Sequence, residues 1–150
     1  MANTYSQLRA HLVFSTQGRR PLLTGKITES LHAYMDGILK HEDAVPLCIG
    51  GYHDHVHLLL GFRPTHRLSD LVRVLKSNSS AWLNEQTGLH AKFAWQRGYS
   101  IFSVSHSQVE VVRKYVSNQI QHHQKMTFEE ELRLLLNKHG IEFDEAYLLD

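Results

Sequence analysis

The sequence has very little cysteine and no long apolar run. Its 150 residues include one cysteine, Cys48, so the chain cannot form an internal disulfide, and thiolate-rich zinc sites are excluded. No apolar stretch approaches the length of a membrane span. Residues 1–11 lack the basic and apolar segments of an export signal. We therefore expect a cytoplasmic protein with no membrane partner.

The chain also lacks a strong overall charge, but its charges are unevenly distributed. The net charge is +1, yet residues 127–150 hold seven acidic and two basic side chains. Residues 1–126 therefore carry a balance of +6. A basic body is compatible with a polyanionic partner. Many enzymes carry such a charge, so charge alone does not identify the partner.

No repeat or low-complexity tract is visible, and the length fits one domain over residues 1–150. Alternating apolar residues predict strands over 5–16, 45–52, 55–62 and 93–105. Helical spacing predicts helices over 27–41, 68–86 and 107–124, and a further helix that ends near Gly140. Thr28 and Ser69 are candidate N-caps, and Ser107 with Glu110 and Thr127 with Glu130 match the capping-box pattern.

The first six predicted elements follow the order β-α-β-β-α-β. This order predicts an α+β, ferredoxin-like fold with an antiparallel sheet and helices on one face. The helix over 107–124 and a C-terminal helix follow it. The opposite face of the sheet remains free to hold a site.

Two histidines occupy alternate positions in the strand predicted over 55–62. Side chains alternate across a strand, so His55 and His57 share one face, while Val56, Leu58, Leu60 and Phe62 point to the core. Two such imidazoles can bind one metal ion, although an ordinary pair of surface histidines fits equally well. His53 is a possible third ligand in the turn. Asp54 is either a partner for an imidazole N–H or simply a turn residue.

The helix predicted over 107–124 carries a second group of polar residues. Tyr115 and Gln119 are four positions apart, so they lie on one face of that helix. Beside them runs an apolar stripe made of Val109, Val112, Val116 and Ile120. A half-buried tyrosine and a solvated glutamine would also explain the pattern. We expect His122 and His123 at a solvated helix end.

Together these motifs resemble a known family. "HVH" at 55–57, followed by the Y-x-x-x-Q of Tyr115 and Gln119, resembles the single-tyrosine HUH transposases of IS200-like insertion sequences. "WQRGYSIFSVS" (95–105) and "QHHQKMTFEEEL" (121–132) are also similar to that family. The resemblance extends from Tyr5 to about Tyr147.

The resemblance implies a function and a set of site residues. His55, His57 and Gln119 would hold a divalent ion, Mg²⁺ or Mn²⁺, although imidazole also suits zinc. Tyr115 would attack single-stranded DNA, form a 5′-phosphotyrosine and free a 3′-OH without ATP. Family members recognise hairpins at the ends of the element and act as homodimers. Both properties are therefore expected of this chain.

Several basic residues are candidate phosphate contacts. They are Arg19 and Arg20 in the loop after the first strand, Arg63 and Arg67 after the HVH strand, and Arg73 and Lys76 on one helix face. Trp95, Tyr99 and Phe102 are either base-stacking residues or core residues.

Other functions fit parts of the pattern. A domesticated or inactive relative that binds hairpin DNA would retain the same residues. A non-catalytic ferredoxin-like module that binds nucleic acid would use aromatic residues of the sheet. A metal hydrolase would use H-x-H with Asp54 and give Tyr115 no role. Tyr115→Phe separates these functions, because only a tyrosine strand transferase should lose all cleavage.

Overall fold

The computed structural model describes residues 3–86 and 92–150 and contains one antiparallel sheet. Its strands lie in the order β2-β3-β1-β4. They are β1 (Leu8–Ser15), β2 (Val45–Tyr52), β3 (His55–Phe62) and β4 (Ser100–Ser103). Helix α1 (Lys26–His41) joins β1 to β2, and helix α2 (Leu68–Asn84) lies between β3 and β4. The predicted ferredoxin-like arrangement is confirmed.

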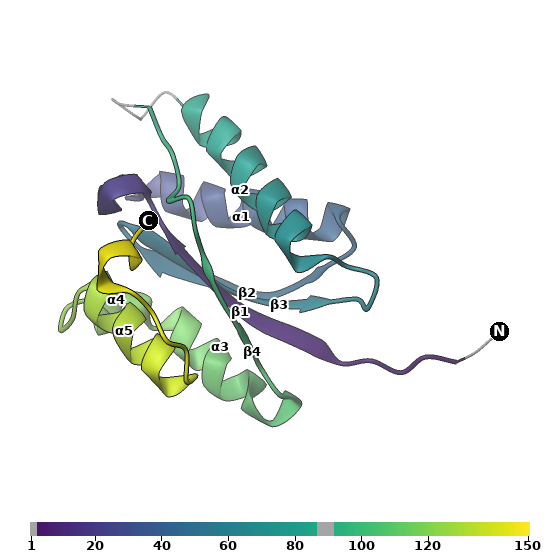
Figure 1. Ribbon diagram of the computed structural model, residues 1–150. Helices are drawn as coiled ribbons and strands as arrows, with labels where there is room; N and C mark the ends of the chain where they lie inside the picture. Colours follow the sequence, from purple (N-terminus) through teal and green to yellow (C-terminus); the bar gives the residue numbers. More distant parts are fainter. Residues whose placement is uncertain (1–2, 87–91) are drawn as a thin grey trace.

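Helices cover both faces of this sheet (Figure 1). Helices α1 and α2 lie on one face, as predicted, and enclose the main apolar core. Three further helices lie on the other face: α3 (Val109–Ser117), α4 (Gln119–His122) and α5 (Phe128–Lys138). The second face is therefore covered, and any site on it lies between the sheet and these helices. Among the described helices, none is long and apolar enough to cross a membrane.

Strand β3 separates the core from the second face. Val56, Leu58 and Leu60 belong to the core under α1 and α2. Leu59 packs on the opposite face with Val104 and Val109. The β2–β3 hairpin has the bounds that the sequence predicts, because its alternation of side chains is regular and its turn is short.

The strand predicted over 93–105 is only partly formed. Residues 100–103 pair with β1, and Trp95 makes an isolated bridge to Thr16. Between them, the ammonium of Lys76 donates hydrogen bonds to the carbonyls of Gln96, Arg97 and Gly98. These carbonyls are engaged by a side chain instead of a neighbouring strand, so the strand starts late.

The predicted helix ends are partly wrong. Helix α1 begins at Lys26 and α2 begins at Leu68, so neither Thr28 nor Ser69 is the cap. Ser107 contacts the hydroxyl of Ser105 and caps no helix. Thr127 is a cap as predicted, because its Oγ1 accepts a hydrogen bond from the Glu130 backbone N–H at 3.2 Å.

Helix α5 packs its apolar side against β1 and β4. Phe128, Leu132, Leu135 and Leu136 form a buried cluster with Val13 and Phe102. Gly140 follows the helix with φ +68°, a left-handed conformation that glycine adopts without strain, as expected at the end of a helix. The acidic C-terminal segment is thus part of the layer that covers the second face.

Candidate active site

Two histidines of β3 form the floor of a buried site between the sheet and α3–α5. The side chains of His55 and His57 are fully buried. Their shared face is the one opposite the main core, as predicted from strand alternation. The alternative of two surface histidines is therefore wrong.

Each of these imidazoles has a polar partner at its Nδ1 atom. Nδ1 of His55 donates to Oδ1 of Asp54 at 2.7 Å. Nδ1 of His57 lies 2.7 Å from Nε2 of His11, a buried residue of β1. Both rings are oriented so that Nε2 points into the site. Asp54 is thus an imidazole partner as well as a turn residue.

Gln119 lies in the site directly after a break in the helix predicted over 107–124. Helix α3 ends at Ser117, Asn118 has φ −100° and ψ 20°, and α4 begins at Gln119. Gln119 is buried, and its Oε1 lies 3.1 Å from Nε2 of His55. The amide N–H of Gln119 donates to the Tyr115 carbonyl, which directs the amide oxygen toward the histidines.

The same break overturns part of the predicted apolar stripe. Val109 and Val116 are buried, but Ile120 is 65% exposed. Tyr115 and Gln119 both face the site, as their four-residue spacing predicts, whereas Ile120 follows the turn at Asn118 and faces solvent.

Tyr115 reaches the histidine site of its own chain. Its ring centroid lies 5.6 Å from that of His57, and its hydroxyl donates to Oε2 of Glu131. Burial, followed by the negative charge of Glu131, raises the pKa of Tyr115 well above its usual value. The phenol is therefore held in its protonated form.

Glu131 of α5 is the central residue that the sequence analysis missed. It is buried, and its Oε1 lies 3.0 Å from Nε2 of His57 and 3.1 Å from Nε2 of His123. Burial alone would raise the pKa of Glu131, but hydrogen bonds from His123 and His57 hold it well below the usual range. The carboxylate is therefore charged. A glutamate next to Phe128 and Leu132 on a buried helical stripe was the available signal.

His123 was expected at a solvated helix end, and this expectation is wrong. Its side chain is 2% exposed. Its Nδ1 donates to the Met126 carbonyl at 2.8 Å, and its Nε2 lies 3.0 Å from Oε1 of Gln119. His122, with a side chain 30% exposed, lies at the rim. The turn after α4 folds His123 back over the sheet instead of leaving it in solvent.

The ligand atoms of four side chains lie close enough to hold one metal ion. One atom each of His55, His57, His123 and Glu131 lies within 4.8 Å of the other three. Imidazole nitrogen and carboxylate oxygen are ordinary ligands of divalent transition metals. The donor set therefore fits a divalent cation. His53 is not in this group; its ring stacks on Tyr52 at 4.2 Å.

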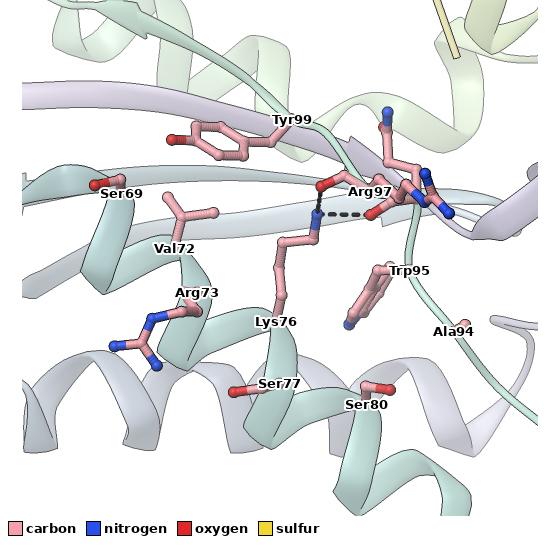
Figure 2. Close-up of a pocket in the computed structure, with 11 residues that line it drawn as sticks. Ser69, Val72, Arg73, Lys76, Ser77, Ser80, Ala94, Trp95, Arg97 and Tyr99 are labelled. Atoms are coloured by element: carbon pink, nitrogen blue, oxygen red, sulfur yellow. Dashed lines mark hydrogen bonds between the residues drawn. The ribbon is translucent and has the colours of Figure 1, made fainter. Parts of the chain in front are cut away.

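Two of the predicted DNA contacts lie beside a pocket that does not include the histidines. Arg73 and Lys76 line a pocket of about 410 Å³ between α2 and residues 94–99, together with Arg97 and Tyr99 (Figure 2). The Lys76 ammonium is engaged by backbone carbonyls, whereas Arg73 and Arg97 are exposed. Trp95 and Phe102 are buried, and Tyr99 is exposed.

The other arginines that were predicted to contact DNA lie outside the strands and α-helices. Arg19 forms an ion pair with Glu129 at 3.5 Å, and Arg20 donates to the Lys92 carbonyl at 3.4 Å. Arg63 and Arg67 are exposed between β3 and α2. Their role in DNA binding stays a prediction.

Known proteins with similar sequences are transposases. The chain is 27% identical over 118 residues to the ISDra2 transposase TnpA of Deinococcus radiodurans, covering 75% of this chain and 84% of that protein. It is 26% identical over 126 residues to the IS200 transposase of Salmonella typhimurium, covering 81% and 82%.

Solved structures share the fold. A candidate transposase from Deinococcus radiodurans R1 superposes with a TM-score of 0.62 at 24% identity, covering 79% of this chain and 95% of that one. A REP-associated tyrosine transposase bound to a REP hairpin superposes with a TM-score of 0.57 at 13% identity, covering 77% and 68%.

A match to a family model identifies the family of this chain. The model described as "Transposase IS200 like" matches residues 4–119, which include β1, β3 and α3. His55, His57, Tyr115 and Gln119 all lie inside this match, whereas His123 and Glu131 lie beyond it. The chain belongs to the family of IS200-like transposases.

Proposed function

We propose that this transposase cleaves and rejoins single-stranded DNA at the ends of an insertion sequence, with Tyr115 as the nucleophile. The proposal rests on one observation. The Tyr115 hydroxyl lies in the same buried site as the Nε2 atoms of His55 and His57, because all three groups contact the carboxylate of Glu131. A nucleophile beside a potential metal site is the arrangement that phosphoryl transfer needs.

The residues of this site fit a divalent ion, with Mg²⁺ or Mn²⁺ as the proposed metal. His55, His57 and Gln119 are its proposed ligands, since both histidines belong to the group that could hold one ion and Oε1 of Gln119 lies 3.1 Å from Nε2 of His55. When bound, such an ion polarises the scissile phosphate and stabilises the departing 3′ oxygen. Asp54 and His11 support the proposal, because they hold the two histidines in the orientation that ligation requires.

The proposed reaction exchanges one phosphate ester for another. The Tyr115 phenolic oxygen attacks the phosphorus, an O–P bond forms to tyrosine, and the bond from phosphorus to the 3′ oxygen breaks. The phenolic proton passes toward Oε2 of Glu131, which already accepts that hydrogen bond. The 3′ oxygen leaves and takes up one proton, which balances the proton that the phenol releases. The reverse reaction rejoins strands without ATP, since the phosphotyrosine retains the energy of the phosphodiester.

Hairpin DNA with an unpaired flank is the proposed substrate. One structural neighbour is a tyrosine transposase bound to a REP hairpin, which supports DNA as the partner of this chain. Arg73, Arg97 and Tyr99 line an open pocket, where guanidinium groups would pair with phosphates and the tyrosine ring with an unpaired base (Figure 2). Arg19, Arg20, Arg63 and Arg67 are proposed to extend the phosphate contacts.

A homodimer is the proposed assembly. Val111, on the helix that carries Tyr115, and Ile120, on the following helix, are 57% and 65% exposed, and apolar side chains of this kind often contact a partner. Within one chain Tyr115 already reaches His57, so we propose that each chain can complete its own site. The mass of the protein in solution, measured by light scattering, tests the dimer.

A covalent-adduct assay tests the function. The protein is mixed with single-stranded DNA from both flanks of its own gene, with Mn²⁺ or with a chelator, and separated under denaturing conditions. We expect a DNA-linked band that needs both the metal and Tyr115. Tyr147→Phe is the control, because Tyr147 is an exposed tyrosine outside the site. Hairpin binding without any adduct would instead indicate an inactive relative or a binding module.

A further inference from the structure

We propose that His123 and Glu131 are ligands of the metal ion, so that five side chains hold it. The inference rests on the proposed function, because it concerns the same metal. It goes beyond the ligand set of His55, His57 and Gln119. Both added residues follow Gln119, where the match to the family model ends.

The spacing of the potential ligand atoms supports this set. Adjacent ligands around an octahedral ion with bonds of about 2.1 Å lie roughly 3.0 Å apart. Oε1 of Glu131 lies 3.0, 3.1 and 3.4 Å from the Nε2 atoms of His57, His123 and His55. Oε1 of Gln119 lies 3.0 and 3.1 Å from the Nε2 atoms of His123 and His55. These pairs therefore have the spacing of neighbours in one coordination shell.

The orientation of the imidazole rings supports the same set. His123 donates its Nδ1–H to the Met126 carbonyl, and His55 donates its Nδ1–H to the Asp54 carboxylate. Each ring can therefore present the lone pair of its Nε2 atom to a metal ion in the site, where that ion takes the place of a proton. The facing atoms are the Oε1 oxygens of Gln119 and Glu131, which are acceptors as well. A shared cation between these acceptors satisfies all of them.

Charge complementarity also favours this set. His55, His57 and Gln119 supply three neutral ligands and no negative charge. Glu131 adds a buried carboxylate within reach of the histidines, and Mg²⁺ and Mn²⁺ prefer carboxylate oxygen.

Glu131 then has two contacts at once. Its Oε1 faces the imidazoles, and its Oε2 accepts the hydrogen bond from the Tyr115 hydroxyl. A carboxylate bound to the ion through Oε1 keeps Oε2 free for the phenol. Glu131 therefore ties the position of the nucleophile to the metal, and helix α5 completes the site that β3 begins.

Binding of Mn²⁺ without DNA, followed by electron paramagnetic resonance, tests this ligand set. We expect Glu131→Gln and His123→Ala each to weaken Mn²⁺ binding at least about tenfold, since loss of an indirect partner already costs 10–100-fold. Glu130→Gln and His41→Ala are the matched controls, because both residues are exposed. They should bind as the wild type does.

The outcomes separate this inference from the proposed function. Loss of binding in His55→Ala, with wild-type affinity in Glu131→Gln and His123→Ala, would overturn the five-ligand set and leave the proposed function intact. Absence of Mn²⁺ binding in the wild type would overturn both. If a variant fails to fold, electron spin echo spectroscopy of the wild type still decides. Three coordinated imidazoles support the inference, and two contradict it.

Discussion

Nε2 of His11 lies 2.7 Å from Nδ1 of His57, on the neighbouring strand of the sheet. Burial, with a smaller effect of His57, lowers the pKa of His11 to about 3, so His11 is neutral and can accept a hydrogen bond. When His57 binds a metal through Nε2, its Nδ1–H donates to His11. The pair therefore holds the ring of His57 in the orientation that ligation needs.

We predict that His11→Ala weakens Mn²⁺ binding by about 10–100-fold. Asp54→Ala should have a similar effect through His55, whose Nδ1–H donates to Asp54. Asp54→Asn is the matched control, because the amide oxygen retains an acceptor for that N–H. Calorimetric titration with Mn²⁺ measures all three variants. Equal affinity of Asp54→Ala and the wild type would contradict the account.

The position of Tyr115 depends on a glycine in β2. A Cβ atom at Gly50 would overlap the Val116 carbonyl oxygen of α3 and lie 3.2 Å from Cγ1 of the same valine. We predict that Gly50→Ala pushes α3 away from the sheet. Because a displacement of about 1 Å can cost 100-fold in rate, adduct formation should fall by roughly that factor. A time course of adduct formation measures the rate.

Gly37→Ala on α1 is the control for that variant. No atom lies within 4 Å of the Cβ position at Gly37, and the residue lies inside a helix. This change should leave the cleavage rate unchanged and stabilise the protein by about 0.5–1 kcal/mol. Full activity in Gly50→Ala would show that the close contact between β2 and α3 does not position the tyrosine.

The cap of α5 matters because that helix carries Glu131. Oγ1 of Thr127 accepts from the Glu130 backbone N–H. We predict that Thr127→Ala lowers the free energy of unfolding by about 1 kcal/mol. Ser107→Ala, at a position that matches the same pattern but makes no cap, should change it by less than about 0.5 kcal/mol. Urea denaturation measures both, and equal losses would count against the cap.

The pocket beside α2 should affect DNA binding and leave the chemistry intact. We predict that Arg73→Ala and Arg97→Ala each weaken binding of single-stranded DNA and lower the salt slope by about one. Lys40→Ala, on the exposed side of α1, is the control. Binding at several salt concentrations, measured by fluorescence anisotropy, gives the slopes. At saturating DNA the adduct yield should be unchanged, and unaltered slopes would show that DNA does not use this pocket.

Local patterns predicted the sheet well. The alternation in β3 placed His55 and His57 on one face, because a strand with one face in the core has only one register. The late start of β4 was not predictable in the same way. It depends on Lys76, a residue of α2 that binds carbonyls about twenty positions later in the chain.

Only some residues of the site could be predicted from the sequence. The four-residue spacing of Tyr115 and Gln119 predicted a shared helix face, but it does not reveal the break at Asn118, after which Ile120 is exposed. Glu131 lies 74 positions after His57, so only the fold brings the two together. Its place on the buried stripe of α5 was a usable signal, because an unpaired glutamate is rarely buried.

Mass spectrometry of the DNA-linked protein tests the central claim most directly. After the reaction with Mn²⁺, a nuclease digests the linked DNA and a protease digests the protein. The peptide that carries a residual nucleotide is then sequenced. We expect a 5′-phosphate ester on Tyr115 and an unmodified Tyr52, whose ring centroid lies 5.4 Å from that of His123, a proposed metal ligand. A nucleotide on another residue, or cleaved DNA with no modified peptide, would contradict the account.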